Sequence, residues 1–197
     1  MRSYVWLALG LGLFSGSAMA SNTGFGVTLY GGQSSNQDLH TSQKAVVELA
    51  DKNHFGVSFD RYLDKKRYGF FYSMVETEFE DSPIYKVDME YLMFQSAIDV
   101  DITDNLDSYI GAQIGVNKVT PNFEEPDHFF AAGFYGGLKY DLGAGFSALT
   151  ELRWLASSIK NSSKVRCDGS DEDVCAWHFD GDVLNQFQLN VGLTYRF

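Results

Sequence analysis

The sequence predicts an all-β protein, an eight-stranded antiparallel up-and-down transmembrane β-barrel. Three observations predict this fold: an export-type N-terminus, strict alternation of apolar and polar residues over 185–197, and connections that alternate between short and long. Successive strand side chains point to opposite faces, so an alternating segment has one apolar and one polar face. A soluble barrel turns its apolar face inward, whereas a membrane barrel turns it to lipid.

Residues 1–20 have the form of a secretory signal peptide. Arg2 precedes an apolar run over 5–14, and the small residues Ala18 and Ala20 form an Ala-x-Ala cleavage site. The run is about ten residues long, too short for a membrane helix; an uncleaved anchor is the alternative. We expect residues 21–197 to form one barrel domain. No later stretch is apolar enough for a helix, so an integral membrane protein with this sequence must be a closed barrel.

The rest of the chain divides into eight β-type runs. The expected strands are residues 24–33, 54–63, 67–79, 84–102, 106–119, 128–142, 146–159 and 185–197. The gaps at 64–66, 103–105 and 143–145 are short, whereas those at 34–53, 80–83, 120–127 and 160–184 are mostly longer and more polar. Every second connection of an up-and-down barrel lies on the same rim, so one rim should carry turns and the other loops. An even strand count returns both termini to the turn rim, which we expect to be periplasmic.

Two segments complicate this assignment. Residues 44–50 (KAVVELA) can also form a strand, and we interpret them as an extension of the second strand, since a ninth strand would break the alternation of loops. In the fourth strand the polar residues change register, and we expect a β-bulge near Leu92 and Met93. The two polar sets are Lys86, Asp88 and Glu90, then Gln95, Asp99 and Asp101.

The polar face of the expected strands has the composition of a narrow barrel lumen filled by side chains. It mixes Gly, Gln, Asn, Ser and Thr with a few charges, and we assign Glu151, Arg153 and Arg196 to the lumen, where they can pair. A water-exposed exterior would carry more Lys and Glu. The apolar face ends in aromatic residues, as interfacial girdles do; these are Tyr140, Trp154, Tyr195 and Phe197.

Composition excludes some functions and indicates the redox compartment. A net charge of −11 disfavours nucleic acid as a partner, because phosphate binding needs clustered Lys and Arg. Cys167 and Cys175 lie in a polar stretch, and such a pair in an exported chain predicts a disulfide that closes a loop. Metal binding by the pair is the alternative, with His178 as the nearby histidine.

The final strand resembles the terminal signature of Gram-negative outer-membrane barrels. The matching residues are Leu189, Val191, Leu193, Tyr195 and the C-terminal Phe197. The resemblance implies recognition by the barrel assembly machinery and location in the cell outer membrane, beside lipid and lipopolysaccharide. In size and layout the chain resembles the small OmpA-like, porin-family barrels. Stretches such as "FGVSFDRYL" and "RYGFFYS" look like a poorly characterised subgroup with no established activity. We expect a monomer.

Catalytic and metal candidates are few. His40 and Ser42 have the His-x-Ser spacing of the lipid A deacylase family, and Asp127 and His128 are similar to the Asp-His pair of outer-membrane aspartyl proteases. Residues 168–175 are acidic enough for Ca²⁺ but lack the ligand spacing of a helix-loop-helix site. We prefer a polar loop for the first candidate, a rim histidine for the second and a solvated acidic loop for the third. We therefore expect no catalytic residue, no metal site and no cofactor.

We therefore expect a barrel whose lumen is filled by side chains. Its role would be structural, or it would interact with a partner through its extracellular loops, and the sequence does not identify that partner. A narrow porin-like channel for ions or small solutes is one alternative. A lipid-modifying enzyme is the other.

Overall fold

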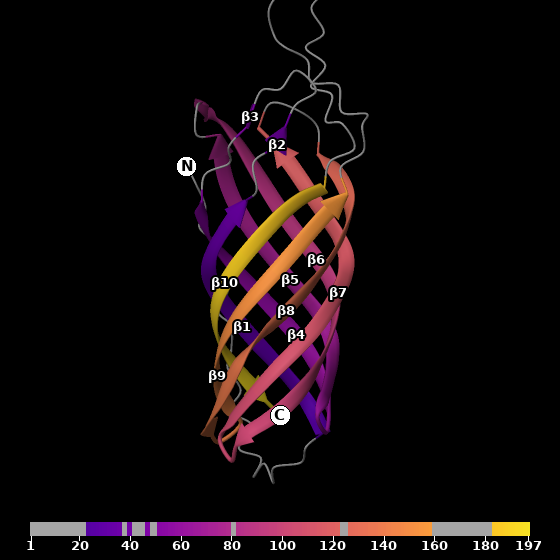
Figure 1. The fold of residues 1–197 in the computed structure, drawn as a ribbon, viewed down its shortest axis with the longest axis vertical. Coiled ribbons are helices and arrows are strands. Elements are labelled where there is room, and N and C mark those ends of the chain that lie inside the picture. The colour runs from indigo at the N-terminus through magenta and orange to yellow at the C-terminus, as the bar shows by residue number, and fades with distance from the viewer. Residues whose placement is uncertain are drawn as a thin grey trace, which may run out of the picture.

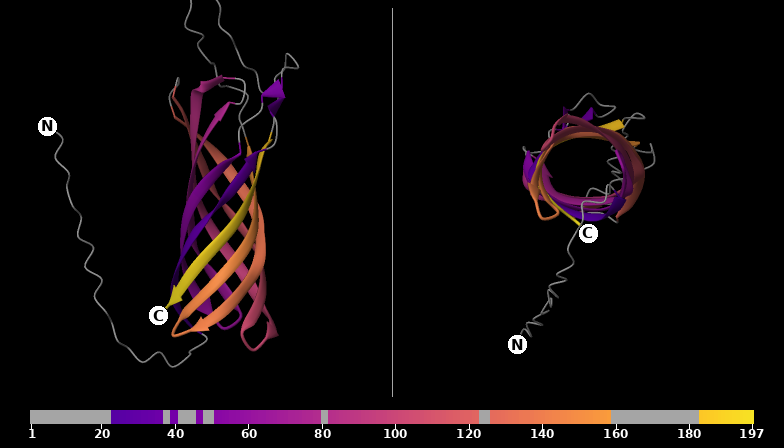
Figure 2. Two further views of the ribbon diagram at one scale, coloured as in Figure 1. Left: turned by 90° about the vertical axis from the view of Figure 1, so that its left-hand side faces the viewer. Right: turned by 90° about the horizontal axis from the view of Figure 1, so that it is seen from below.

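The computed structural model describes residues 23–36, 39–40, 46–47, 51–79, 82–122, 126–158 and 183–197. Eight of its strands form a closed antiparallel barrel in the order β1-β10-β9-β8-β7-β6-β5-β4 (Figure 1). The predicted fold is confirmed. The barrel strands are β1 (Thr23–Asn36), β4 (Lys52–Leu63), β5 (Lys66–Phe79), β6 (Ser82–Thr103), β7 (Leu106–Pro121), β8 (Asp127–Gly143), β9 (Phe146–Ser158) and β10 (Val183–Arg196). Seen along its axis the ring is complete (Figure 2). Among the described residues, no helix is long and apolar enough to cross a bilayer.

Two short strands lie outside the barrel. β2 (Leu39–His40) pairs with β3 (Val46–Val47) in a separate two-stranded sheet. The expectation that residues 44–50 extend the second barrel strand is therefore wrong for Val46 and Val47. The apolar β-branched residues do favour a strand, but they pair locally with β2 and add no strand to the barrel.

Tight turns gather at one end of the barrel, which we call the turn end; the opposite end is the loop end. Leu63 pairs with Lys66, Thr103 with Leu106, and Gly143 with Phe146, so each turn has two residues outside the pairing. Two of these three turns contain residues with positive φ, a conformation common in tight hairpins. Asp64 (55°), Gly143 (84°), Ala144 (53°) and Gly145 (82°) adopt it.

Backbone pairing of the first and last barrel strands closes the ring at the turn end. The N–H of Phe25 donates to the carbonyl of Phe197 at 2.9 Å, and the N–H of Phe197 donates to the carbonyl of Phe25 at 2.8 Å. The register then continues along β1 and β10 to Asn36 and Gln186. No barrel strand is left as an open edge, which a membrane-spanning sheet requires.

β6 keeps a single register where a bulge was expected. Its pairing with β5 runs unbroken from Ile98 to Lys86, so the predicted bulge near Leu92 and Met93 is wrong. The irregularities lie elsewhere, at Glu78/Phe79 and Asp101/Thr103.

The apolar face of β6 changes sides while the strand continues. Toward the loop end, Lys86, Asp88 and Glu90 point outward, and Val87, Met89 and Tyr91 are buried inside. Toward the turn end, Leu92, Phe94 and Ile98 point outward, and Gln95 and Asp99 are buried inside. The polar residues therefore change faces because the surroundings of the strand change, and no residue is inserted.

An apolar belt surrounds the turn-end part of the barrel. Ile110, Val191 and Leu152 are 62–68% exposed on its outer surface. The outward apolar residues run from Leu92 to Ile102 on β6 and from Phe187 to Phe197 on β10. Each segment is about 11 residues long, and a tilted transmembrane strand needs roughly 9–11. Beyond this belt the hairpin of β5 and β6 extends past β9 and β10 at the loop end (Figure 1).

This arrangement predicts which connections reach the cell exterior. An epitope tag inserted after residue 171, in the connection between β9 and β10, should react with antibody on intact cells, because that connection joins loop-end strand termini. A tag after Asp104, in a turn-end hairpin, should react only after permeabilisation. The opposite pattern would reverse the orientation of the barrel.

Candidate functional site in the barrel lumen

Apolar side chains fill much of the lumen, most of them toward the loop end. Met89, Tyr91, Met93 and Leu155 are each 0% exposed. We call the cluster to which they belong the apolar plug. It consists of Tyr30, Phe71, Val75, Val87, Met89, Tyr91, Met93, Ala131, Leu149, Leu155 and Leu184. The apolar plug receives inward side chains from six strands, which are β1, β5, β6, β8, β9 and β10. These side chains pack across the lumen.

A buried ion pair occupies the middle of the lumen. Glu151 and Arg153, alternate residues of β9, are each 1% exposed, and Arg153 Nε lies 2.9 Å from Glu151 Oε1. Tyr109 donates its hydroxyl to Glu151 Oε2 at 3.0 Å. Asn190 Nδ2 approaches Glu151 Oε1 at 3.5 Å. The carboxylate therefore has partners on both oxygens, from three strands.

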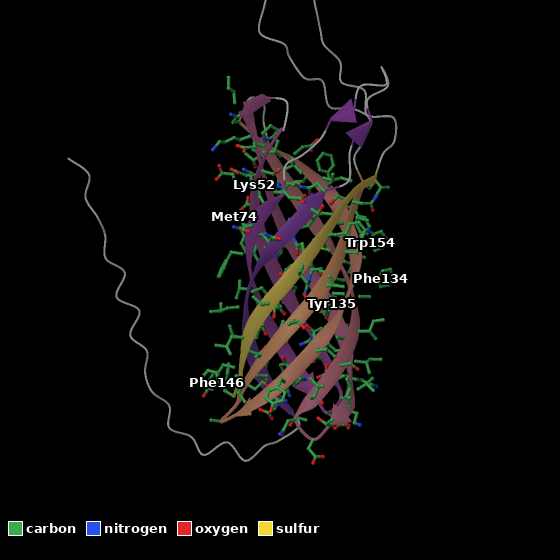
Figure 3. The ribbon with its side chains drawn as sticks, turned by 60° about the vertical axis from the view of Figure 1, so that its left-hand side comes forward. Lys52, Met74, Phe134, Tyr135, Phe146 and Trp154 are labelled. Atoms are coloured by element: carbon green, nitrogen blue, oxygen red, sulfur yellow. The ribbon has the colours of Figure 1, made fainter. Side chains whose placement is uncertain are left out.

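Arg153 extends this network across the barrel. Its Nη2 donates to Gln95 Oε1 on β6 at 3.1 Å, and its Nη1 donates to Gln113 Oε1 on β7. The guanidinium lies 3.6 Å from the ring centre of Phe71 and 4.5 Å from that of Tyr135. Cation–π contacts of this kind are worth about 2 kcal/mol or more when desolvated. Arg153 thus links strands on opposite sides of the ring. Figure 3 shows Tyr135 within the barrel, whereas its neighbour Phe134 and the stacked Trp154 lie outside.

Arg67 is a second buried guanidinium, and it is held differently. It is 1% exposed, and its three nitrogens form no hydrogen bond with any described residue. Its charge lies 4.2 Å from the ring centre of Tyr109 and 5.9 Å from that of Tyr135. Sequence reasoning did not assign Arg67 to the lumen, although the expected strand 67–79 begins with this residue. The outward alternation of Tyr68, Phe70 and Tyr72 was the signal that placed it on the luminal face.

The turn-end part of the lumen contains a second ionic cluster. Lys139 Nζ lies 2.5 Å from Asp99 Oδ2 and 3.3 Å from Asp107 Oδ2, and Lys139 and Asp99 are nearly inaccessible. Arg196 is half-buried nearby, with its guanidinium 5.5 Å from the ring centre of Tyr62. The three charges assigned to the lumen therefore occupy two levels. Glu151 and Arg153 lie in the middle, whereas Arg196 lies near the turn end.

Ser34, His54 and Asn190 form a hydrogen-bonded chain in the lumen. Ser34 Oγ lies 2.9 Å from His54 Nδ1, and His54 Nε2 lies 2.6 Å from Asn190 Oδ1. A serine, a histidine and an orienting group can constitute an activated nucleophile. Here Ser34 and Asn190 are both 0% exposed, so a substrate cannot reach the serine in this conformation. The chain satisfies the two ring nitrogens of a buried histidine.

The described catalytic candidates from the sequence do not lie together in one site. Asp127 and His128 are exposed at the start of β8, where the backbone N–H of His128 donates to Asp127 Oδ1 at 2.8 Å. His40 lies in β2, away from the barrel strands. The described ranges contain no group of three or more His, Cys, Asp or Glu that could hold a metal ion. Several candidates lie outside the described residues: Ser42, Cys167, Cys175, His178 and the acidic stretch 168–175. The disulfide therefore stays a prediction.

The residues of the terminal signature share one environment. They point outward from β10 and belong to the apolar belt. Leu189 (56%), Val191 (62%), Leu193 (46%), Tyr195 (41%) and Phe197 (60%) are all exposed. Aromatic rings cluster around the end of this strand, since Tyr195 packs against Phe146 with ring centres 4.8 Å apart and Phe197 against Phe25 at 6.5 Å.

Ion pairs cover the outer face of the barrel beyond the apolar belt at the loop end. Lys52 pairs with Glu78 at 2.6 Å, Lys86 with Glu76 at 2.9 Å, and Lys118 with Glu90 at 2.8 Å. The hydrogen bond from Lys52 lowers the pKa of Glu78, and those from Lys118 and then Tyr72 lower the pKa of Glu90. The change from belt to ion pairs marks the boundary between an apolar and an aqueous exterior.

Comparison with known proteins supports the architecture. No protein-family model and no curated protein matches the sequence. Among solved structures, 28 chains match by fold. The crystal structure of Neisserial surface protein A aligns with a TM-score of 0.60 at 13% identity, over 88% of this chain and 97% of that one. The solid-state NMR structure of the outer membrane protein AlkL aligns with a TM-score of 0.57 at 16% identity, over 93% of this chain and 95% of that one. At these identities the likeness shows a shared fold.

Removing the luminal carboxylate should destabilise the barrel. Glu151→Ala leaves the buried Arg153 charge without its ion-pair partner, and we expect a loss of about 3–5 kcal/mol of unfolding free energy. Urea unfolding in lipid vesicles, followed by the gel mobility of unheated samples, measures it. The matched control Glu76→Ala removes an exposed pair and should cost under about 1 kcal/mol. Equal losses in both variants would contradict a structural role for the luminal pair.

The loop-end ion pairs should respond to acid. Because the folded-state pKa values of Glu78 and Glu90 are lowered, their stabilisation is complete above the ordinary pKa of a glutamate and is lost as pH falls through the lowered values. Hydrogen-exchange protection factors of residues 76–78 and 86–90 should therefore fall in acid, after correction for intrinsic rates. Protection of residues 94–98, in the apolar belt, should not change. A uniform fall over both segments would contradict a local effect.

Proposed function

We propose that this protein is an integral outer-membrane β-barrel with a filled lumen, and that its role is structural or surface-interactive through its loop end. The observation that carries this proposal is the change of the apolar face along β6. An apolar exterior over about 11 residues suits a bilayer, while the buried Met89, Tyr91 and Met93 leave the lumen without an aqueous path through the apolar plug.

The outer membrane is the location that the other features favour. The export-type N-terminus leads out of the cytoplasm, and the signature from Leu189 to Phe197 provides the pattern that the barrel assembly machinery recognises. Solved structures with this fold include Neisserial surface protein A and the outer membrane protein AlkL in lipid bilayers. Outer-membrane lipid and lipopolysaccharide would then be the surroundings of the monomeric barrel.

We propose no catalytic role. Ser34 is the serine with a histidine partner among the described residues, and it is closed off inside the lumen. Within the described part of the chain, the backbone N–H of His128 donates to Asp127 at the start of β8. Comparing lipid A and phospholipid species between a deletion strain and its parent tests the lipid-modifying alternative, which predicts a species lost on deletion.

A narrow channel is the alternative that one observation favours. Polar atoms of Arg67, Tyr62 and Tyr135 lack hydrogen-bond partners within the described structure. These atoms make part of the lumen polar. A channel for ions or small solutes would need the lumen to rearrange around them.

Single-channel recording separates the filled lumen from the channel. The wild-type barrel in a planar bilayer should give no unitary conductance steps, because the apolar plug has no polar path. The variant with Tyr91→Ala and Met93→Ala shrinks the plug and should produce steps, which also shows that the assay detects inserted protein. Insertion of both proteins is checked by gel mobility before heating. Steps of constant size from the wild type would overturn the filled lumen and support the channel.

A further inference from the structure

The outer wall of the barrel contains a groove of about 220 Å³ within the apolar belt. Ser58 and Phe71 pair across β4 and β5 and form the floor of the groove, because their side chains point into the lumen. Its walls are outward apolar and aromatic side chains of the adjacent strands β1, β4, β5 and β6, namely Val27, Val57, Phe59, Phe70, Tyr72 and Leu92. The groove therefore opens toward the surroundings of the barrel, which in an inserted barrel are lipid chains.

An arginine stands beyond the groove in the direction of the turn end. Phe59, in the wall of the groove, stacks on Phe25 with ring centres 5.5 Å apart. Phe25 forms the backbone seam with Phe197 at the turn end. Arg61 pairs with Phe25 across to β1, and its guanidinium lies 4.6 Å from the centre of the Phe25 ring. Arg61 points outward, since its neighbour Tyr62 is buried inside, so it marks the turn-end limit of the groove.

A second cation, Lys66, lies close to Arg61 on the outer face. Arg61 pairs with Tyr68 on β5, and Lys66 is exposed two residues before Tyr68 on the same face. Diagonal neighbours of this kind are about 7–8 Å apart, within reach of long side chains. Neither Arg61 nor Lys66 belongs to an ion pair formed among the described residues, whereas Lys65 pairs with Asp101 at 2.7 Å. Two cations therefore lie together at the edge of the apolar belt, in a chain whose net charge is −11.

We propose that Arg61 and Lys66 bind the phosphate of one anionic phospholipid with a glycerol head group, and that its acyl chain lies in the groove. The inference rests on the proposed function, in which the turn end is periplasmic. The periplasmic leaflet of an outer membrane consists of phospholipid, whereas lipopolysaccharide occupies the outer leaflet. Arg61 and Val57 are four residues apart, about 13 Å along an extended strand. An acyl chain of one leaflet, about half of the 30 Å hydrocarbon core, covers this length.

The charge at this site discriminates between head groups. A guanidinium donates two parallel N–H bonds to a phosphate, and an ammonium adds a second positive charge. A glycerol head leaves the phosphate as the one charge of the lipid, so both cations attract it. Ethanolamine and choline heads add a positive charge, which Arg61 and Lys66 repel. The carboxylates of Asp64 and Asp101 interact with Lys65, so they offset this repulsion only in part.

A tryptophan placed beside the groove reports lipid binding. Phe94 points outward on β6 and packs against Phe70 with ring centres 5.7 Å apart, but it does not line the groove. The reporter protein combines Phe94→Trp with Trp154→Phe and Trp177→Phe, so that the fluorescence of residues 21–197 comes from position 94. Lipids brominated at the same chain position, with glycerol, ethanolamine or choline heads, are titrated in lipid discs that each hold one barrel.

The glycerol lipid should reach half-maximal quenching at a mole fraction roughly two- to fivefold lower than the other two lipids, the range expected for exposed ion pairs. Arg61→Gln should abolish the preference, and Lys66→Gln should reduce it. Lys86→Gln removes the same charge at the loop end and should leave the preference unchanged. Val57→Phe fills the groove and should raise the mole fraction needed for all three lipids. Val191→Phe adds the same ring to the outer face of β10 and should not.

Equal quenching by the three lipids would mean ordinary annular contact and overturn the proposal. A preference that survives Arg61→Gln would place the anionic lipid elsewhere, and one that Lys86→Gln also abolishes would reflect the net charge of the chain; both results overturn the site. Gel mobility before heating reports insertion separately. A protein that fails to insert refutes the membrane barrel itself, whereas an inserted protein without preference refutes only the lipid site.

Discussion

The backbone hydrogen bonding of a closed ring constrains every other feature of this molecule. Each of the eight strands pairs with two neighbours around the circle, so the pairing must persist across the apolar belt, and the irregularities in the pairing of β6 lie near its ends. The chain adapts to different surroundings through its side chains alone. On β6 the same two alternating faces serve an aqueous exterior near Lys86 and an apolar one near Phe94. The apolar set moves from inside to outside between these residues, and no backbone irregularity is needed.

The lumen shows a corresponding division. On β6, where the exterior is charged, the inward side chains are apolar, and Met89 and Tyr91 belong to the plug. Where the exterior is apolar, the interior carries the ion pairs and hydrogen bonds of Glu151, Arg153 and Gln95. The buried charges are compensated by partners from several strands, and Arg67 by aromatic faces. One half of the lumen is thus packed mainly with apolar side chains, and the other contains paired charges.

Most of the strand architecture could be predicted from the sequence, because alternation with period two and the position of turn residues are local signals. The strand from Phe146, with Leu152 outside and Arg153 inside, is placed correctly by alternation. The bulge predicted on β6 does not form. The exterior of this strand changes from charged to apolar along its length, and such a change produces the same sequence pattern as a shift in register. Val46 and Val47 were misassigned because strand propensity does not say which strand is the partner. The pairing of Arg153 with Gln95 and Gln113 depends on contacts between distant strands that no local pattern encodes.

Closure through Phe25 and Phe197 has a consequence for biogenesis. Phe25 and Phe197 complete the ring through their N–H and carbonyl groups, and they are among the first and last residues of the described barrel. The pairing of β1 with β10 therefore joins residues with the longest sequence separation in the fold. Contacts at such separation form slowly, because the entropy of bringing the ends together must be overcome before they stabilise anything. A chain interrupted before β10 would leave β1 and β9 with unpaired edges, which invite strand addition from other chains. Only a chain that includes both β1 and β10 can therefore close the ring.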